Sequence, residues 1–154
     1  MAGMLYLVPT PIGNLGDISK RARETLESAD FIAAEDTRVT LKLLNHLELK
    51  KPLVSYYEHN KSFKGEKILD RILAGETCAL VSDAGSPAIS DPGEDLVKQC
   101  AAAGIPVCAI PGPCAAITAL SISAQSTGRF CRRCSGSRPT SGAPDHRRRN
   151  TACG

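Results

Sequence analysis

The sequence has no long apolar run, and none approaches the roughly 18 residues that a helix needs to cross a bilayer. It also lacks the charged and then apolar opening of a secretory signal segment, because a short apolar run over 4–8 follows almost at once. These absences exclude a helical membrane protein, and we expect a cytoplasmic one. At 154 residues, with 42% hydrophobic and 23% charged residues, the chain suits a single globular domain with a sizeable core.

Several common site motifs are missing as well. The sequence contains no G-x-x-x-x-G-K-[ST] loop, which excludes an ordinary P-loop NTPase, and no G-x-S-x-G turn of a hydrolase. Gly13 and Gly16 have the spacing of the last two glycines of G-x-G-x-x-G, but the first glycine is absent. Asp36 follows Gly16 by twenty residues, where a ribose-binding acid can lie, so a dinucleotide site stays an alternative.

The seven cysteines are an odd number and show no disulfide pattern. Cys78 and Cys108 lie in apolar runs and are interpreted as small buried side chains. Cys100 and Cys114 fit helix faces. We therefore expect reduced structural thiols.

The last 24 residues, 131–154, contain no Val, Ile, Leu, Met, Phe, Tyr or Trp. Such a segment cannot bury enough apolar surface to offset the entropy of ordering, so we expect it to be disordered or loosely attached. The charge balance changes at the same point. Residues 1–130 carry 13 Lys+Arg and 15 Asp+Glu, whereas 131–154 carry six Arg, no Lys and one Asp. We therefore divide the chain into a domain over 1–130 and an Arg-rich tail over 131–154.

The tail has three interpretations. Its Arg147–Arg149 run could bind nucleic-acid phosphates. Cys131 and Cys134, with His146 and Cys153, could bind zinc, but their spacing matches no closed structural site, so no metal site is assigned. The abrupt switch to Arg, Ser, Gly, Pro and Cys is typical of a coding strand read in the wrong frame. We favour this third hypothesis, which the nucleotide sequence of the gene would decide.

Short apolar runs alternate with helical patterns through the first 130 residues. Strands are expected over 5–8, 31–34, 52–57, 78–81 and 107–110. Helices are expected over about 18–29, 38–46, 64–74, 92–104 and 113–123. Strands without polar alternation are buried on both faces, and the helices between them make right-handed crossovers. The sequence therefore predicts an α/β fold, a three-layer α/β/α arrangement with a mostly parallel five-stranded sheet.

The helix patterns also predict caps and core positions. Asp17 is expected to cap the first helix, Gly75 to stop the third, and Asp91 with Pro92 to open the fourth. The expected inward-facing residues are Ala22, Leu26 and Ala29, then Leu41, Leu44 and Leu47, then Ile68, Leu69 and Ile72.

Three segments that follow expected strands are rich in Pro and Gly, namely 9–17, 82–93 and 111–118. Glycine lets a ligand approach the backbone closely and proline stiffens a loop, so together they form a wall of backbone N–H and C=O groups. Because parallel α/β sheets bind ligands at the carboxyl ends of their strands, three such loops predict a binding cleft. Its wall suits a zwitterionic, cationic cofactor with a ribose and an adenine. The alternative is that the loops are only tight strand-to-helix turns.

The segments after the second and third strands carry polar site candidates. Glu35, Asp36 and Arg38 follow the second strand, where two carboxylates and an arginine can orient hydroxyls or phosphates. The alternative for this segment is helix capping beside a solvated arginine. His59 and Asn60 follow the third strand on a loop.

Four blocks of sequence carry a resemblance to a known family. They are LYLVPTPIGNLGDI at 5–18, AAEDTR at 33–38, LVSDAGSPAISDPG at 80–93 and PGPCAAITAL at 111–120. In order and spacing they resemble the tetrapyrrole methylase superfamily, and the similarity covers residues 4–130. This resemblance implies a non-Rossmann α/β fold that uses S-adenosylmethionine. Within the superfamily the blocks are most similar to the branch that methylates a cytidine 2′-hydroxyl in the decoding region of 16S ribosomal RNA.

The resemblance also implies a cofactor position and partners. S-adenosylmethionine would lie against the loops after the first, fourth and fifth strands, with Pro11, Asp83, Gly85, Pro87, Ile89, Pro111, Gly112 and Thr118 as neighbours. Family members are homodimers, and the cofactor lies between two α/β domains of each subunit. A ribose hydroxyl is a weak nucleophile, so a general base would help. The candidates for that base are Glu35, Asp36 and His59, with Arg38 and Asn60 positioning the RNA.

The sequence departs from the family pattern after Arg129 and Phe130. The family continues into a linker and a second domain, whereas only the tail follows here, so we expect a truncated enzyme that lacks half of the pocket. Three alternatives stay open. They are another methyltransferase of this superfamily, a non-catalytic nucleotide- or dinucleotide-binding module, and a fragment without activity. The block at 35–38 argues, by resemblance, against the first of them.

Overall fold

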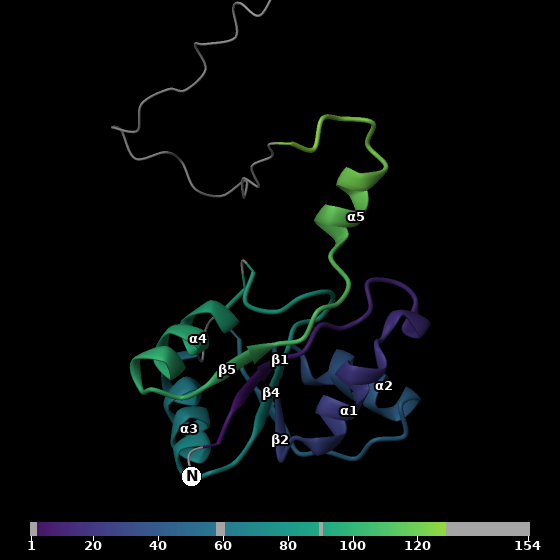
Figure 1. Ribbon diagram of the computed structural model, residues 1–154. Helices are drawn as coiled ribbons and strands as arrows, with labels where there is room; N and C mark the ends of the chain where they lie inside the picture. The colour runs from purple at the N-terminus through teal and green to yellow at the C-terminus, as the bar shows by residue number, and fades with distance from the viewer. Residues whose placement is uncertain (1–2, 58–60, 90, 129–154) are drawn as a thin grey trace, which may run out of the picture.

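The computed structural model describes residues 3–57, 61–89 and 91–128, and a parallel sheet forms its centre (Figure 1). The strands are β1 (Leu5–Leu7), β2 (Phe31–Ala34), β3 (Leu53–Ser55), β4 (Cys78–Val81) and β5 (Val107–Ala109). They lie in the order β3-β2-β4-β1-β5, and every neighbouring pair is parallel. The predicted five-stranded parallel sheet is confirmed.

Within the described residues, five helices accompany the sheet, and four of them cover its two faces (Figure 1). They are α1 (Lys20–Ser28), α2 (Thr37–His46), α3 (Lys61–Leu73), α4 (Gly93–Ala102) and α5 (Ala115–Ser121), with a 3₁₀ turn, η1 (Leu15–Asp17), before α1. The helices α1 and α2 pack on one face of the sheet, and α3 and α4 pack on the other. The three-layer α/β/α arrangement is therefore confirmed.

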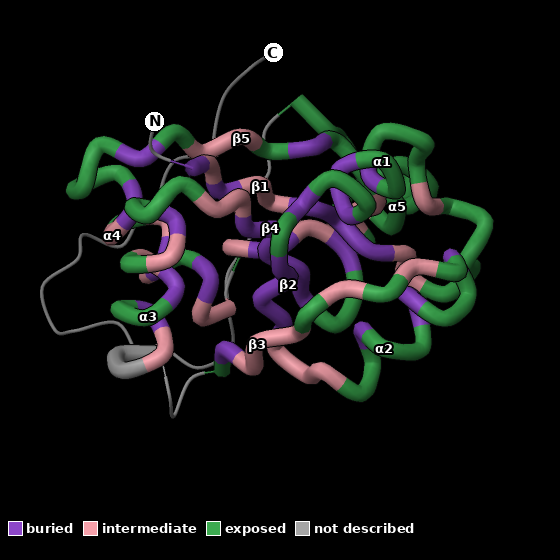
Figure 2. The backbone as a smooth tube through the Cα atoms, turned by 90° about the horizontal axis from the view of Figure 1, so that it is seen from below, coloured by how far each residue is buried: buried purple, intermediate pink, exposed green. Residues whose placement is uncertain are grey.

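Two apolar clusters hold the layers together, one on each face of the sheet. On the first face, α1 and α2 with the residues that end them contribute Ala22, Leu26, Ala29, Leu43, Leu44 and Leu47. On the second face, α3 and α4 contribute Ile68, Ile72, Leu96 and Cys100. All four residues of both β2 and β4 are buried, because these strands lie inside the sheet and are covered on both faces (Figure 2).

The fifth helix differs from the others in its surroundings. No residue of α5 is buried, and the helix lies beyond the carboxyl edge of the sheet, apart from both helical layers (Figure 1). Its Ile117 side chain is 50% exposed. The expected fifth helix thus forms, but it packs on neither face of the sheet.

Several sequence predictions about single residues are wrong. Ser19 caps α1, since its hydroxyl accepts the Ala22 N–H at 3.1 Å, whereas Asp17 ends the preceding 3₁₀ turn. Leu41 is 50% exposed, because the buried face of α2 runs through Leu43 instead. Cys108 is only half-buried, because β5 is an edge strand.

Other expectations about these elements are confirmed. Gly75 follows α3 with φ +106° and donates its N–H to the Ile72 carbonyl at 3.0 Å, so it stops the helix. Cys78 and Cys100 are buried free thiols. Cys114 is a half-buried free thiol, but it is the N-cap of α5 and does not lie on the face of that helix as expected. None of the helices within the described residues is both long enough and apolar enough to cross a membrane.

Candidate functional site

The loops after β1 and β4 are joined at the carboxyl edge of the sheet. Thr10 and Gly85 exchange two backbone hydrogen bonds, with N···O distances of 2.9 Å and 3.0 Å. The Thr10 hydroxyl also donates to the Ser82 carbonyl at 3.2 Å. Gly85 has φ +84°, a conformation that favours glycine. This pairing fixes the two loops against each other.

The loop after β5 packs against both of them. A Cβ atom on Gly112 would lie 2.2 Å from Cγ of Pro9, so the backbone approaches that ring as closely as only glycine allows. The Ser86 hydroxyl donates to the Pro113 carbonyl at 3.3 Å. The three Pro- and Gly-rich loops therefore meet at one edge, and they do more there than make separate turns.

One pocket opens beside these loops, on the face of the sheet that α2 covers. Its volume is about 290 Å³. The lining residues are Thr10, Pro11, Leu15, Val39, Thr40, Lys42, Leu43, Ser82 and Asp83. Leu15 and Val39 are 44% and 40% exposed, so apolar side chains form part of an open wall. We call this space the α2 pocket.

A second pocket opens on the face that α4 covers, with a volume of about 310 Å³. The lining residues are Leu7, Ser86, Pro87, Ala88, Ile89, Glu94, Val97, Ala109 and Ile110. The Ile89 side chain is 59% exposed, which leaves an apolar group at this wall. We call this space the α4 pocket. Loops after β4 and β5 contribute to it, together with the first turn of α4.

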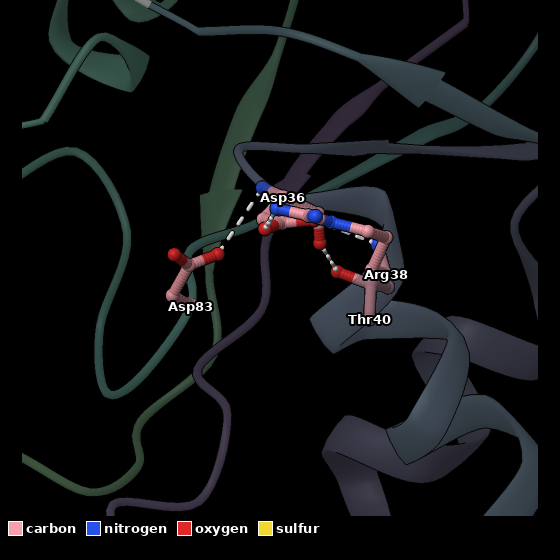
Figure 3. A network of polar contacts seen from close by, with 4 residues as sticks. All are labelled: Asp36, Arg38, Thr40 and Asp83. Carbon is pink, nitrogen blue, oxygen red and sulfur yellow. Dashed lines mark hydrogen bonds and ion pairs between the residues drawn. The ribbon is translucent and has the colours of Figure 1, made fainter.

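Asp36 and Arg38 form a network at the start of α2 (Figure 3). The Asp36 carboxylate accepts the Arg38 backbone N–H at 2.8 Å and two guanidinium N–H bonds at 3.1 Å and 2.8 Å. These bonds lower the pKa of Asp36 to about 2. The Arg38 side chain is 88% exposed. The capping alternative for this segment is confirmed, and both oxygens of Asp36 are engaged by Arg38.

Asp83 connects the end of β4 to this network. Its carboxylate accepts the Asp36 backbone N–H at 3.1 Å, as the dashed line in Figure 3 marks. The contact joins segments 47 positions apart in sequence, and it places one carboxylate of the loop after β4 against the end of β2. Asp83 is also a lining residue of the α2 pocket.

Glu35 lies half-buried at the end of β2, among other acidic groups. Burial, and the negative charges of Asp83 and Asp91, raise the pKa of Glu35. A small cavity of about 10 Å³ lies between Glu35, Tyr56, Ser82 and Asp91, among other residues. A carboxyl group with a raised pKa accepts protons more readily at neutral pH than an ordinary glutamate does. The pKa of Glu35 is therefore higher than that of an ordinary glutamate.

The predicted site residues fall into separate groups in the structure. Pro11 and Asp83 line the α2 pocket, and Pro87 and Ile89 line the α4 pocket. Gly85 lies in the pairing with Thr10. Pro111 and Gly112 are exposed at the edge of the sheet, and Thr118 is exposed on α5, where its hydroxyl donates to the Cys114 carbonyl at 2.9 Å. His59 and Asn60 lie outside the described residues.

Sequence reasoning missed several residues that build this edge. Thr10 and Ser82 were not singled out, because their hydroxyls act within the loops. Leu15 and Val39 line the α2 pocket, and the available signal was that both are apolar residues away from the inward face of their helical turns. Asp91 was expected to cap the fourth helix with Pro92 in its first turn, but Pro92 is the N-cap of α4. The contacts of the Asp91 carboxylate with the Gly93 and Ala88 N–H groups went unpredicted.

Metal ligands are a separate question. Within residues 3–57, 61–89 and 91–128, no group of three or more His, Cys, Asp or Glu side chains could hold a metal ion. Cys131, Cys134, His146 and Cys153 lie outside the described residues.

Comparison with known sequences gives close relatives. The chain is 54% identical over 129 residues to the ribosomal RNA small subunit methyltransferase I of Escherichia coli O157:H7, covering 84% of this chain and 45% of that protein. It is 57% identical over 128 residues to the protein of the same name from Halalkalibacterium halodurans, covering 83% and 44%. The chain therefore spans about half the length of the curated relatives it matches.

Comparison with solved structures supports the fold. A conserved hypothetical protein of Aeropyrum pernix K1 has a TM-score of 0.67 at 21% identity, covering 85% of this chain and 46% of that one. A uroporphyrin-III-C-methyltransferase of Thermus thermophilus has a TM-score of 0.60 at 24% identity, covering 79% and 52%.

Family assignment follows from the match of a whole-family profile. The family described as "Tetrapyrrole (Corrin/Porphyrin) Methylases" matches residues 4–152, which is most of the chain. This match includes all three loops at the carboxyl edge and both pockets beside them. The chain belongs to the tetrapyrrole methylase family.

Proposed function

We propose that this chain forms one side of an S-adenosylmethionine-dependent methyltransferase that acts on the ribose 2′-hydroxyl of a cytidine in 16S ribosomal RNA. The observation that carries the proposal is the joining of three Pro- and Gly-rich loops at the carboxyl edge, with a pocket on each side of the sheet. The relatives at 54% and 57% identity, both named for methylation of small-subunit ribosomal RNA, support the choice of reaction and substrate.

The chemistry of the edge fits S-adenosylmethionine. The cofactor is cationic at sulfur and at its amino group, and carboxylates of Glu35 and Asp83 supply negative charge at this edge. The adenine needs an apolar wall, which Pro87, Ile89 and Ile110 supply in the α4 pocket. Exposed backbone at Pro111 and Gly112 adds hydrogen-bonding groups beside that wall.

The residues that would hold the cofactor are those the family resemblance assigns. They are Pro11, Asp83, Gly85, Pro87, Ile89, Pro111, Gly112 and Thr118. When bound, S-adenosylmethionine supplies a methyl carbon activated by a sulfonium. The rigid pairing of Thr10 with Gly85 would keep the surrounding loops in one arrangement, which favours alignment of the acceptor oxygen with that carbon.

We assign the proton acceptor to Glu35. It would accept the proton that the ribose hydroxyl releases during methyl transfer. Burial and two neighbouring carboxylates favour this role, because they raise the pKa of Glu35. Asp36 is a weaker candidate, since Arg38 engages its carboxylate and lowers its pKa. His59 and Asn60 stay candidates for a base and for RNA positioning.

The partners follow from the same proposal. The RNA would approach along the start of α2, where the Arg38 side chain is exposed. The functional enzyme would be a homodimer in the cytoplasm, with a second domain closing the cofactor between two walls. Residues 1–130 would contribute the first of these walls.

Calorimetry on the 154-residue chain tests the cofactor. We expect S-adenosylhomocysteine and S-adenosylmethionine to bind, and NAD and ATP not to bind. NAD binding without any response to S-adenosylhomocysteine would overturn the proposal in favour of a dinucleotide-binding module.

Methyl transfer to isolated 30S subunits tests the reaction. The variants are Glu35→Gln and Glu35→Ala in the chain joined to the second half of the Escherichia coli relative. We expect Glu35→Gln to bind S-adenosylhomocysteine normally and to transfer methyl groups at least about a hundredfold more slowly, the usual weight of a general base. Equal rates for Glu35→Gln and the parent would remove Glu35 from this role.

A further inference from the structure

The wall of the α4 pocket contains a residue in an unfavourable backbone conformation. Ala88 has φ +63°, in the left-handed region that side chains other than glycine rarely adopt. It lies between Pro87 and Ile89, and all three residues line the pocket. Other contacts must therefore hold this segment in place.

Asp91 supplies these contacts. Its Oδ1 atom accepts the Ala88 N–H at 3.0 Å and the Gly93 N–H at 2.8 Å. A Cβ atom on Gly93 would lie 2.7 Å from that oxygen and 2.8 Å from a methyl carbon of Leu80, so only glycine fits there. One carboxylate oxygen thus ties the pocket wall to the first residue of α4.

The helix behind this contact is anchored in the core. Leu96 and Cys100 of α4 are fully buried in the cluster shared with α3 and the sheet. The helix α4 cannot shift without disturbing that cluster. Because the Asp91 carboxylate binds both Gly93 of α4 and Ala88, it holds Ala88 in a fixed position relative to the core.

Asp91 also faces the proposed proton acceptor. It lines the small cavity that Glu35, Tyr56 and Ser82 share. Two carboxylates act on Glu35 from different segments, Asp83 after β4 and Asp91 before α4. A single residue is therefore in contact with the pocket wall and in electrostatic reach of Glu35.

We infer that Asp91 is a positioning residue that holds Pro87, Ala88 and Ile89 in the arrangement that receives the methyl donor and also sets the electrostatic environment of Glu35. This inference rests on the proposed function. Its two parts can be separated, because asparagine keeps the acceptor oxygen of Asp91 and removes its charge.

The binding experiment compares Asp91→Ala, Asp91→Asn and the parent chain by calorimetry with S-adenosylhomocysteine. We expect Asp91→Ala to weaken binding about tenfold or more, since two bonds to a charged acceptor are lost. We expect Asp91→Asn to stay within about threefold of the parent, because a neutral acceptor remains. The matched control is Asp95→Ala, which removes an acidic residue of the first turn of α4 that does not line the pocket.

A double variant tests whether Ala88 is the residue held. Glycine adopts φ +63° without steric cost. Adding Ala88→Gly to Asp91→Ala should therefore recover part of the lost affinity, about two- to fivefold. No recovery would contradict a role that acts through Ala88.

Two further measurements do not depend on cofactor binding. Amide hydrogen exchange should show Ala88 and Gly93 N–H groups protected in the parent and in Asp91→Asn, and exposed in Asp91→Ala. NMR titration of the Glu35 carboxyl should show a lower pKa in Asp91→Asn than in the parent. Circular dichroism would establish that each variant is folded.

The outcomes separate the inference from the proposed function. If Asp91→Ala matched the parent in its affinity for S-adenosylhomocysteine and in its amide hydrogen exchange, the inference would be overturned. The proposed function would not be affected by that result. A parent chain that failed to bind S-adenosylhomocysteine would overturn the proposed function, while hydrogen exchange would still decide whether Asp91 holds Ala88. An unchanged Glu35 titration in Asp91→Asn would overturn the electrostatic part.

Discussion

Gly112 shows how closely the loops after β1 and β5 approach each other. A Cβ atom there would lie 2.2 Å and 2.7 Å from Cγ and Cβ of Pro9, and a ring in a buried loop cannot move aside freely. We expect Gly112→Ala to lower the free energy of unfolding by about 1–3 kcal/mol, the usual cost of overpacking. Urea denaturation measures this change. Gly128→Ala is the matched control, because nothing lies within 4 Å of a Cβ atom there. Equal losses in the two variants would show that the Pro9 contact is not the cause.

The Asp36–Arg38 pair should make stability depend on pH in acid. The pKa of Asp36 falls from 3.8 to about 2 in the folded chain. A lowered pKa means that the pair contributes stability that is fully present above about pH 3.8 and is lost as the pH falls toward about 2. We expect the melting temperature of the parent to fall over this window more than that of Asp36→Asn, which keeps a capping oxygen without the charge. Parallel curves for the two proteins would contradict the prediction.

At the scale of the element, two residues are alternatives for the N-cap of α1. Sequence reasoning assigned it to Asp17, whereas the structure assigns it to Ser19. We expect Ser19→Ala to lower the free energy of unfolding by about 1 kcal/mol, since one N–H at the start of the helix loses its acceptor. Asp17→Ala should leave stability within about 0.5 kcal/mol of the parent, as exposed sites usually do. Chemical denaturation measures the free energy of unfolding of both variants. A larger loss in Asp17→Ala than in Ser19→Ala would show that Asp17 is the cap.

The bounds of helices and strands could be predicted where the local sequence pattern determines them. The strands at 31–34 and 78–81 were predicted with the bounds that the structure has, because both lie inside the sheet and carry no polar residue. The strand expected over 52–57 is shorter, Leu53–Ser55, since it lies at an edge where one side of the ladder is open. The predicted cap of α1 was wrong because Asp17 and Ser19 are both good capping residues, and the 3₁₀ turn that ends at Asp17 has no strong sequence signal.

Strand order is the feature that local pattern could not supply. Placing β1 between β4 and β5 depends on contacts between residues more than 70 positions apart, and no short-range signal encodes them. The same limit applied to the site. The three loops could be predicted to share an edge, but the Thr10–Gly85 pairing and the contact between Asp91 and Ala88 depend on how those loops fold against each other.

For the whole molecule, the proposed domain boundary at residue 130 predicts the effect of shortening the chain. If 131–154 contributes no packed surface, a chain ending at 130 should melt within about 2 °C of the full chain, a difference worth only a few tenths of a kcal/mol. Scanning calorimetry of the two chains makes this comparison. A loss of 5 °C or more would mean, on the same scale, that the tail packs on the domain.

The place of β1 in the sheet has a consequence for how the protein is made. Among the strands of this sheet β1 is synthesised first, yet its partners are Cys78–Leu80 on one side and Val107–Ala109 on the other. The β2–β3 pair can form from residues 31–55 alone, so it can assemble while β1 still has no neighbour. During synthesis the apolar Leu5–Leu7 segment must wait for about a hundred further residues before both of its edges are paired. A chain interrupted before Val107 would make β1 the edge strand of the sheet in place of β5, and would present the backbone of Leu5–Leu7 to strand addition from another molecule.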